Sequence, residues 1–127
     1  MRVGRERFGC FHIMENNIVT KVVVMGGHNN YDGRISSAEI LDVRTMSWQN
    51  LPNLPFAVQN NKGVESVVES YLGFTIGGNS ASHSYERRVV GLKKEGENYR
   101  WQQVNSLSTG RRELASVNAP SSMVPAC

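Results

Sequence analysis

Residues 22–27 read VVVMGG and residues 71–78 read YLGFTIGG, so each is a mainly apolar run that ends in a glycine pair. The pairs, Gly26-Gly27 and Gly77-Gly78, are 51 residues apart. Glycine pairs at the ends of apolar runs are typical of strands that end in tight turns. A repeat of about fifty residues indicates structural units that stack on one another or are arranged radially.

A tryptophan follows each glycine pair at a similar distance. Trp48 lies 21 residues after Gly27, and Trp101 lies 23 residues after Gly78. The two tryptophans are therefore 53 residues apart, close to the spacing of the glycine pairs. Each indole offers a large apolar face for packing between repeated units, together with one N–H that needs an acceptor.

The segments that enter the repeats are also related. Residues 4–11 (GRERFGCF) are similar to residues 110–117 (GRRELASV), which lie 106 positions later, or twice 53. The intermediate copy, expected near Ala57, has lost its arginine. The spacing predicts a first unit at residues 4–55, a second at 56–108, the first strand of a third at 109–118 and a flexible tail at 119–127.

Each unit is predicted to contain four short strands, and no segment has the apolar period of an amphipathic helix. β-Branched and aromatic residues fill the apolar runs, and clusters of Asn, Asp, Gly and Glu separate them. The fold class is therefore all-β. The predicted strands are 8–14, 20–25, 39–43 and 48–51 in the first unit, and 63–69, 71–76, 85–92 and 101–104 in the second.

Composition is that of a single small globular domain of 127 residues with 39% hydrophobic residues. The net charge of +3 accompanies no nucleic-acid recognition motif, so we expect no nucleic-acid partner. No secretory leader or membrane-length apolar run is visible, so we expect no membrane association. Cys10 and Cys127 are expected to be free thiols in a reducing compartment, which favours a cytoplasmic location.

The first unit resembles a kelch repeat. The resemblance lies in residues 22–27 (VVVMGG), 38–48 (AEILDVRTMSW) and 51–55 (LPNLP), and the second copy, at 71–107, keeps the glycine pair, Tyr85 and Trp101. Leu41 and Val43 stand where the family often has Tyr and Pro. The resemblance implies four-stranded antiparallel blades of a β-propeller, here two kelch-type blades and the first strand of a third.

Two blades do not close a propeller, which needs four to eight. Three explanations stay open at this point. The chain belongs to a longer parent that supplies more blades, or it self-assembles, or it is a truncated structural product without independent function.

Several residues are predicted to have structural roles. The four glycines of the two pairs are assigned to turns, and Trp48 and Trp101 to packing between blades. Tyr85 is given a structural role by the kelch resemblance. Arg5 and Arg111 stand at equivalent entries, and Glu39 is the carboxylate proposed to pair with a repeated arginine.

The loops at residues 28–37 and 79–84 follow the glycine pairs and are predicted to bind another protein. Polar, adaptable side chains with one aromatic residue suit peptide recognition. The predicted partner-binding residues are His28, Asn29, Tyr31, Arg34, Ser82 and His83, with Tyr31 and Arg34 as the expected hot spots.

By resemblance, such a module recognises substrates of ubiquitin-ligase adaptors, or binds actin and other cytoskeletal proteins. The alternative is a fragment of a galactose-oxidase-like or lyase-type propeller enzyme. No His/Cys/carboxylate spacing typical of a metal site, and no nucleophile–base pattern, is visible in the sequence. We therefore predict a protein that is not an enzyme and needs no metal or cofactor.

Overall fold

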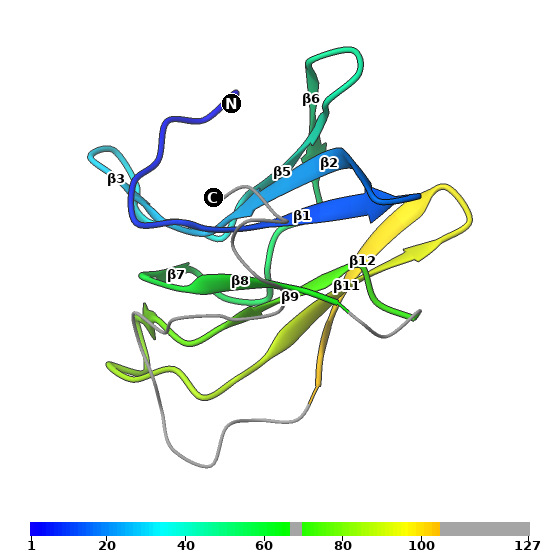
Figure 1. The fold of residues 1–127 in the computed structure, drawn as a ribbon. Helices are drawn as coiled ribbons and strands as arrows, with labels where there is room; N and C mark the ends of the chain where they lie inside the picture. The colour runs from blue at the N-terminus through cyan, green and yellow to red at the C-terminus, as the bar shows by residue number, and fades with distance from the viewer. Residues whose placement is uncertain (67–69, 105–127) are drawn as a thin grey trace.

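A computed structural model describes residues 1–66 and 70–104, and these residues form an all-β structure with two four-stranded antiparallel sheets (Figure 1). The first sheet has the order β1-β2-β5-β6, from β1 (Gly9–Glu15), β2 (Ile18–Met25), β5 (Ala38–Asp42) and β6 (Ser47–Leu51). The second has the order β12-β11-β9-β8, from β8 (Lys62–Glu65), β9 (Gly73–Ile76), β11 (Val90–Glu95) and β12 (Asn98–Gln103).

Two short two-stranded sheets lie at one end of the large ones. The hairpin of β3 (His28–Asn29) and β4 (Gly33–Arg34) follows β2, and β7 (Val58–Gln59) pairs with β10 (Asn79–Ser80). The all-β fold class is thus confirmed, with two sheets of the kind expected for kelch blades. The predicted third-unit strand at 109–118, Arg111 and the tail at 119–127 lie outside the described residues. No described helix is long and apolar enough to cross a bilayer.

The strand predicted at residues 85–92 begins later than expected. β11 starts at Val90, and Tyr85 lies in the preceding loop with its side chain 56% exposed, so it is not in the strand; its structural role stays a prediction. The register shows which residues of the two sheets are equivalent. Leu41 pairs with Trp48 and Leu92 pairs with Trp101, so Leu92 is the residue equivalent to Leu41. The loop before β11, not the strand, contains the tyrosine.

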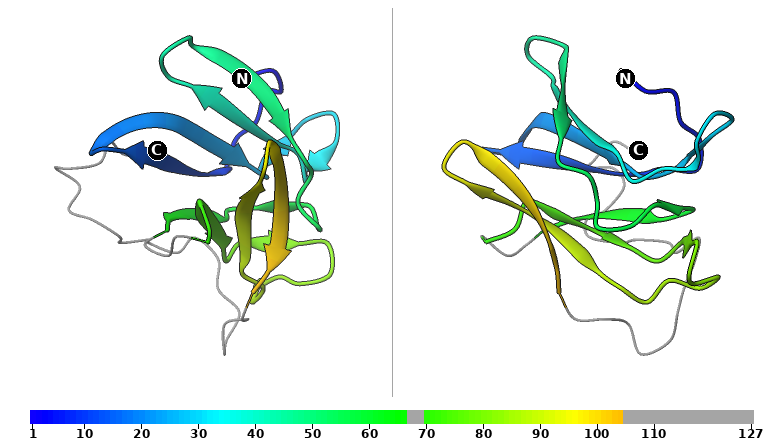
Figure 2. Two further views of the ribbon diagram at one scale, coloured as in Figure 1. Left: turned by 90° about the vertical axis from the view of Figure 1, so that its right-hand side faces the viewer. Right: turned by 180° about the vertical axis from the view of Figure 1, so that it is seen from behind.

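One apolar face of each sheet packs against the other to form the core. Phe11, Val23 and Ile40 lie on the inner face of the first sheet, and Val90 and Leu92 on that of the second, all within one cluster of buried residues. Figure 2 shows the two sheets as adjacent layers, with β1 next to β8 and β9. Because neighbouring strand residues point to opposite faces, the residues between these core positions point away from the interface.

A glycine in the second sheet allows the two layers to approach closely. A Cβ atom on Gly73 would fall against the ring of Phe11, which is itself fully buried. The glycine pairs serve the turns as the sequence predicts. Gly26, Gly27, Gly77 and Gly78 all have positive φ, which side chains with a Cβ rarely adopt.

The predicted packing of a tryptophan between units is confirmed for Trp101. Its ring is partly buried against the core, and its indole N–H donates to the Pro52 carbonyl oxygen at 2.8 Å. Pro52 belongs to the segment that leaves the first sheet, so this hydrogen bond ties the last strand of the second sheet to the first unit. Trp48 is half-buried beside Leu41 on the face of the first sheet that points away from this interface.

The predicted pair of Arg5 and Glu39 is also confirmed. The guanidinium lies 2.9 Å from a carboxylate oxygen of Glu39, and the two side chains are 0% and 1% exposed. Arg5 also donates to the carbonyl oxygens of Gly26 and Ser37, at 2.9 and 2.8 Å. The buried charges are thus both paired and hydrogen-bonded, as buried ion pairs require.

The second unit has an apolar pair where the first has this ion pair. Val24 pairs with Glu39 and Thr75 pairs with Val90, so Val90 takes the position of Glu39. The isolated bridge of Glu6 to His28 matches the pairing of Gln59 to Asn79, so Val58 takes the position of Arg5. Val58 and Val90 are both buried in the common core. These two repeat positions are therefore filled by charges in the first unit and by valines in the second.

One expectation about cysteine is wrong. Cys10, on β1, is disulfide-bonded and is not a free thiol. Cys127 lies outside the described residues. The inference of a reducing compartment loses the support that it took from free thiols, and the cytoplasmic location stays a prediction.

Replacing Gly73 with alanine tests the close approach of the sheets. The added methyl group must displace the Phe11 ring, and overpacking of this kind costs about 1–3 kcal/mol. Urea unfolding of Gly73→Ala should show the loss. Gly4→Ala is the control, because a Cβ atom there meets nothing within 4 Å. Equal stabilities for the two variants would contradict this account of the interface.

The repeat predicts a double-mutant result at Arg5 and Glu39. Glu39→Val alone leaves a buried guanidinium unpaired, which costs about 3–5 kcal/mol. Arg5→Val with Glu39→Val recreates the valine pair of the second sheet and should recover most of that loss. Thermal and urea unfolding of the single and double variants measure the difference. Additive losses would show that the two side chains do not act as a pair.

Candidate partner-binding face

The loop that follows the first glycine pair is a hydrogen-bonded hairpin. β3 and β4 pair through His28 with Arg34 and Asn29 with Gly33. The Asn29 side-chain oxygen accepts hydrogen bonds from the backbone N–H groups of Tyr31 and Asp32, at 3.1 and 2.7 Å. An asparagine that holds its own turn in this way stabilises a fixed loop conformation. Tyr31 lies at the tip, and its side chain is 96% exposed.

An open hollow of about 560 Å³ lies between this hairpin and the N-terminal segment, which is residues 2–6. Its lining includes Arg2, Val3, Glu6, His28, Asn29 and Tyr31. The backbone hydrogen bonds between Glu6 and His28, both 2.9 Å, join the two walls. The hollow therefore combines charged groups of both signs with one aromatic ring.

Glu39 positions the N-terminal wall of the hollow. Its carboxylate accepts hydrogen bonds from the backbone N–H groups of Arg2 and Val3, at 2.6 and 3.3 Å, as well as pairing with Arg5. The buried ion pair of the first sheet thus also anchors the segment that faces the loop. The charged pair of the first unit thus makes a contact that the valines of the second unit cannot make.

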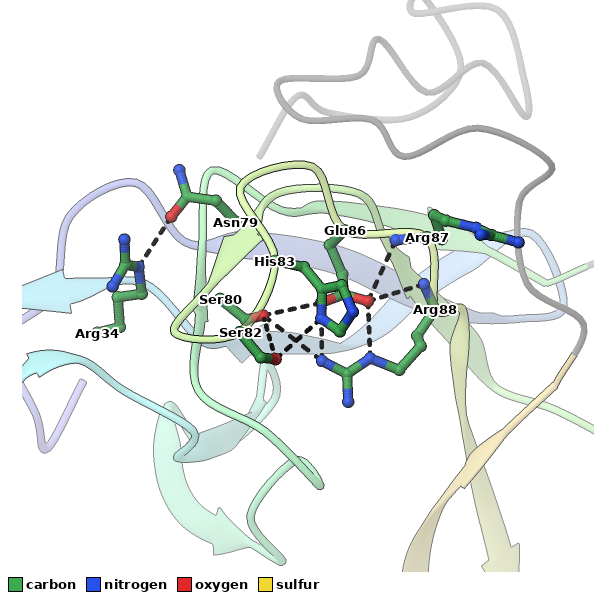
Figure 3. A network of polar contacts seen from close by, with 8 residues as sticks. All are labelled: Arg34, Asn79, Ser80, Ser82, His83, Glu86, Arg87 and Arg88. Carbon is green, nitrogen blue, oxygen red and sulfur yellow. Dashed lines mark hydrogen bonds and ion pairs between the residues drawn. The ribbon is translucent and has the colours of Figure 1, made fainter.

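The second loop is organised around the buried carboxylate of Glu86, whose side chain is 1% exposed (Figure 3). One oxygen accepts from the backbone N–H groups of Arg87 and Arg88, at 3.1 and 2.9 Å, and from the Arg88 Nε at 2.7 Å. The other oxygen accepts from the Ser80 hydroxyl and the Arg88 Nη2, at 2.9 and 2.8 Å. The Arg88 guanidinium also lies over the Phe56 ring, 3.7 Å from its centre.

These contacts change the ionisation of Glu86. Burial raises its pKa, but the hydrogen bonds from Arg88 and Ser80, with the positive charge of Arg88, outweigh burial and lower the pKa to about 2. The same contact raises the pKa of Arg88. Glu86 is therefore ionised at neutral pH and holds the second loop in place.

Ser82, His83 and Glu86 lie close together, but the geometry does not support a proton relay. The His83 Nδ1 is 2.8 Å from the Ser82 hydroxyl oxygen and 3.8 Å from the nearer Glu86 oxygen. A relay needs the hydroxyl and the carboxylate on different ring nitrogens, whereas here both lie beside Nδ1. Among residues 1–66 and 70–104, no three His, Cys, Asp or Glu side chains form a group that could hold a metal ion.

Arg34 joins the two loops. Its Nε donates to the Asn79 side-chain oxygen at 2.9 Å, so β4 of the first loop is tied to β10 of the second (Figure 3). This contact joins the two loops that contain the six predicted partner-binding residues. It also gives Arg34 a role in positioning the loops that the sequence did not predict.

The structure thus divides the predicted residues by their surroundings. His28, Asn29 and Tyr31 line the hollow, Arg34 bridges the loops, and Ser82 and His83 lie exposed on the second loop. Sequence reasoning missed the contribution of the N-terminal segment and the buried Glu86. The N-terminal segment is distant in sequence from the loops that it contacts. For Glu86, the only local signal of a buried pair was the Glu86-x-Arg88 spacing within a polar loop.

The lowered pKa predicts how stability depends on pH. Because the pKa of Glu86 falls from its ordinary 4.5 to about 2 on folding, its stabilisation is complete above pH 4.5 and is lost as the pH falls toward 2. Glu86→Gln should lose about 1.5–3 kcal/mol at pH 7, and the difference from the parent should shrink through this window. Urea unfolding between pH 7 and 2 measures it. Exposed Glu97→Gln is the control, and a constant difference across the window would contradict the assignment.

Comparison with known proteins agrees with the first sheet. Residues 20–55 match the Kelch motif, a stretch that includes β5, β6 and most of β2. No curated protein matches the chain. The second sheet repeats the strand order and the tryptophan register of the first. The first sheet of this all-β chain is thus built on a Kelch motif, and the second sheet repeats its arrangement.

Proposed function

We propose that this chain binds another protein through the loop face formed by residues 28–34, residues 79–83 and the N-terminal segment. The observation that carries this proposal is Tyr31, a large aromatic side chain that is 96% exposed at the tip of a hydrogen-bonded hairpin beside a hollow. Exposed aromatic side chains on fixed turns are typical anchors in protein interfaces. Kelch repeats commonly mediate protein binding, which supports the same function.

Preorganisation of the loop favours binding. Asn29 already fixes the backbone of the turn, so little conformational entropy remains to be lost when a partner contacts Tyr31. The hollow beneath offers Arg2 and Glu6 for polar contacts with an extended segment. A peptide that places an apolar side chain against Tyr31 and polar groups over the hollow fits this arrangement.

Arg34 is expected to act differently from Tyr31. Its Nε is engaged by Asn79, so its removal should loosen one loop relative to the other. Its terminal amino groups make no hydrogen bond to any residue in the described part of the chain, and the exposed guanidinium could pair with a carboxylate of a partner. We propose that Tyr31 supplies contact area and that Arg34 supplies both loop placement and charge.

The finer assignments rest on the kelch resemblance. Recognition of ubiquitin-ligase substrates and binding to actin or other cytoskeletal proteins in the cytoplasm are the partner classes that it suggests. Co-sedimentation with filamentous actin distinguishes actin binding from the recognition of ubiquitin-ligase substrates. With either class of partner, we propose that the chain binds and does not catalyse a reaction.

Selection of peptides on the intact chain tests the loop face. A displayed random-peptide library should yield ligands whose affinity falls tenfold or more in Tyr31→Ala, about 1.4 kcal/mol, because the aromatic anchor is lost. Ile18→Ala is the matched control, since this side chain is 65% exposed at the other end of β2.

Two-dimensional NMR of the bound chain locates the ligand. Shift changes should gather in residues 28–34 and in the N-terminal segment. Ligands that bind Tyr31→Ala as tightly as the parent, with shift changes elsewhere, would refute the proposed face.

A further inference from the structure

His28 differs from the other two histidines in how its ring is held. The Nδ1 of His12 is 3.2 Å from a glutamate oxygen of β8, and that of His83 is 2.8 Å from a serine hydroxyl. The Nδ1 of His28 is buried and has no hydrogen-bond partner among the residues that the structure describes. It nevertheless lies 3.4 Å from a carboxylate oxygen of Glu6. His28 is therefore next to a negative charge to which its ring is not hydrogen-bonded.

His28 and Glu6 lie where the two walls of the hollow meet. Glu6 belongs to the N-terminal segment and His28 begins β3 of the hairpin, and each donates its backbone N–H to the carbonyl oxygen of the other at 2.9 Å. The side chains of Glu6 and His28 are 64% and 31% exposed, and both line the hollow. A change in the attraction between these two side chains therefore acts directly on the contact between the walls.

Histidine is the side chain whose charge changes most readily near neutral pH. Imidazole gains a proton as the pH falls from about 8 to 5, and the charged ring has an N–H on both nitrogens. With the ring charged, Nδ1 is a donor with a positive charge beside the Glu6 carboxylate. The contact then changes from that of a neutral ring with a carboxylate to an ion pair.

The other charges around His28 do not form this pair. The guanidinium of Arg5 is already paired with Glu39, and the Arg34 Nε donates to the second loop. The remaining charged side chains that line or flank the hollow are one acidic and two basic: Asp32, Arg2 and Arg7. Within the described ranges, the carboxylate that pairs with His28 is that of Glu6.

We propose that protonation of His28 forms an ion pair with Glu6 that fixes the N-terminal segment against the hairpin, so that the loop face binds its partner more tightly in mild acid than at neutral pH. The effect on the segment stands by itself, whereas the effect on binding rests on the proposed function. A wall of the hollow that is fixed before binding leaves less conformational entropy to be lost when a peptide binds. Because both side chains are partly exposed, the gain in affinity is small, about two- to fivefold.

Nuclear magnetic resonance of the free chain tests the ion pair. The carboxyl carbon signal of Glu6 should shift as the pH falls from about 8 to 5.5, above the usual range for protonation of a glutamate, because a charge appears on the neighbouring ring. His28→Gln keeps a polar side chain without a titrating proton and should abolish this shift. His83→Gln is the matched control and should retain it, since that ring contacts Ser82. A Glu6 signal that stays constant, or that shifts equally in His28→Gln, would overturn the proposal.

Peptide binding at two pH values tests the effect on the loop face. A library peptide that depends on Tyr31, and that has no histidine or carboxyl side chain, should bind the parent about two- to fivefold more tightly at about pH 5.5 than at about pH 7.5. The ratio of affinities should fall to about one in His28→Gln and in Glu6→Gln, because each variant removes one charge of the pair. An equal ratio in the parent and both variants would overturn the regulation.

The two experiments separate this proposal from the proposed function. If no selected peptide depends on Tyr31, the loop face is refuted, and the Glu6 signal still decides whether the ion pair forms. If peptides depend on Tyr31 but bind the parent equally at both pH values, the loop face stands and the regulation is overturned. Circular dichroism at both pH values checks the folding of each variant. If His28→Gln does not fold, Glu6→Gln decides the binding comparison, and a ratio equal to that of the parent counts against the proposal.

Discussion

The close packing of the two sheets at Phe11 and Gly73 is the constraint on which the rest of the structure depends. A side chain at position 73 would occupy the volume of the Phe11 ring, so the glycine there allows the second sheet to approach the first closely. The approach buries Val90 and Leu92 against Val23 and Ile40. Small sheets have little other apolar surface to bury. Burial of apolar side chains at this interface therefore supplies most of the free energy that stabilises the two sheets.

One pair of repeat positions illustrates how the units have diverged under the same fold. Arg5 and Glu39 fill it with a buried ion pair, and Val58 and Val90 fill it with apolar side chains. A buried pair adds little stability over valines of suitable size, so stability alone does not account for the charges. Glu39 also holds the backbone of Arg2 and Val3, and this places the N-terminal segment beside the hairpin that presents Tyr31. The charged version thus serves the loop face.

The two loops differ in how they are held, and this bears on their use. The first is fixed by a side chain that caps its own turn, Asn29, and leaves its aromatic tip exposed. The second is fixed by Glu86, whose ionised carboxylate collects Arg88, Ser80 and two backbone N–H groups. Arg34 connects them through Asn79. A partner that spans both loops would therefore meet a surface already assembled before binding.

The sequence by itself determined the all-β class, the two units and the turns, because the spacing of glycine pairs and tryptophans reports a periodic backbone. It also suggested Glu39 as a candidate partner of the repeated arginine, and the structure shows the ion pair with Arg5. Only the tertiary structure decided that β11 begins at Val90, that Cys10 is bonded, and that Arg34 meets Asn79. These depend on contacts between segments distant in the chain, and local patterns of residues do not record which distant segments meet.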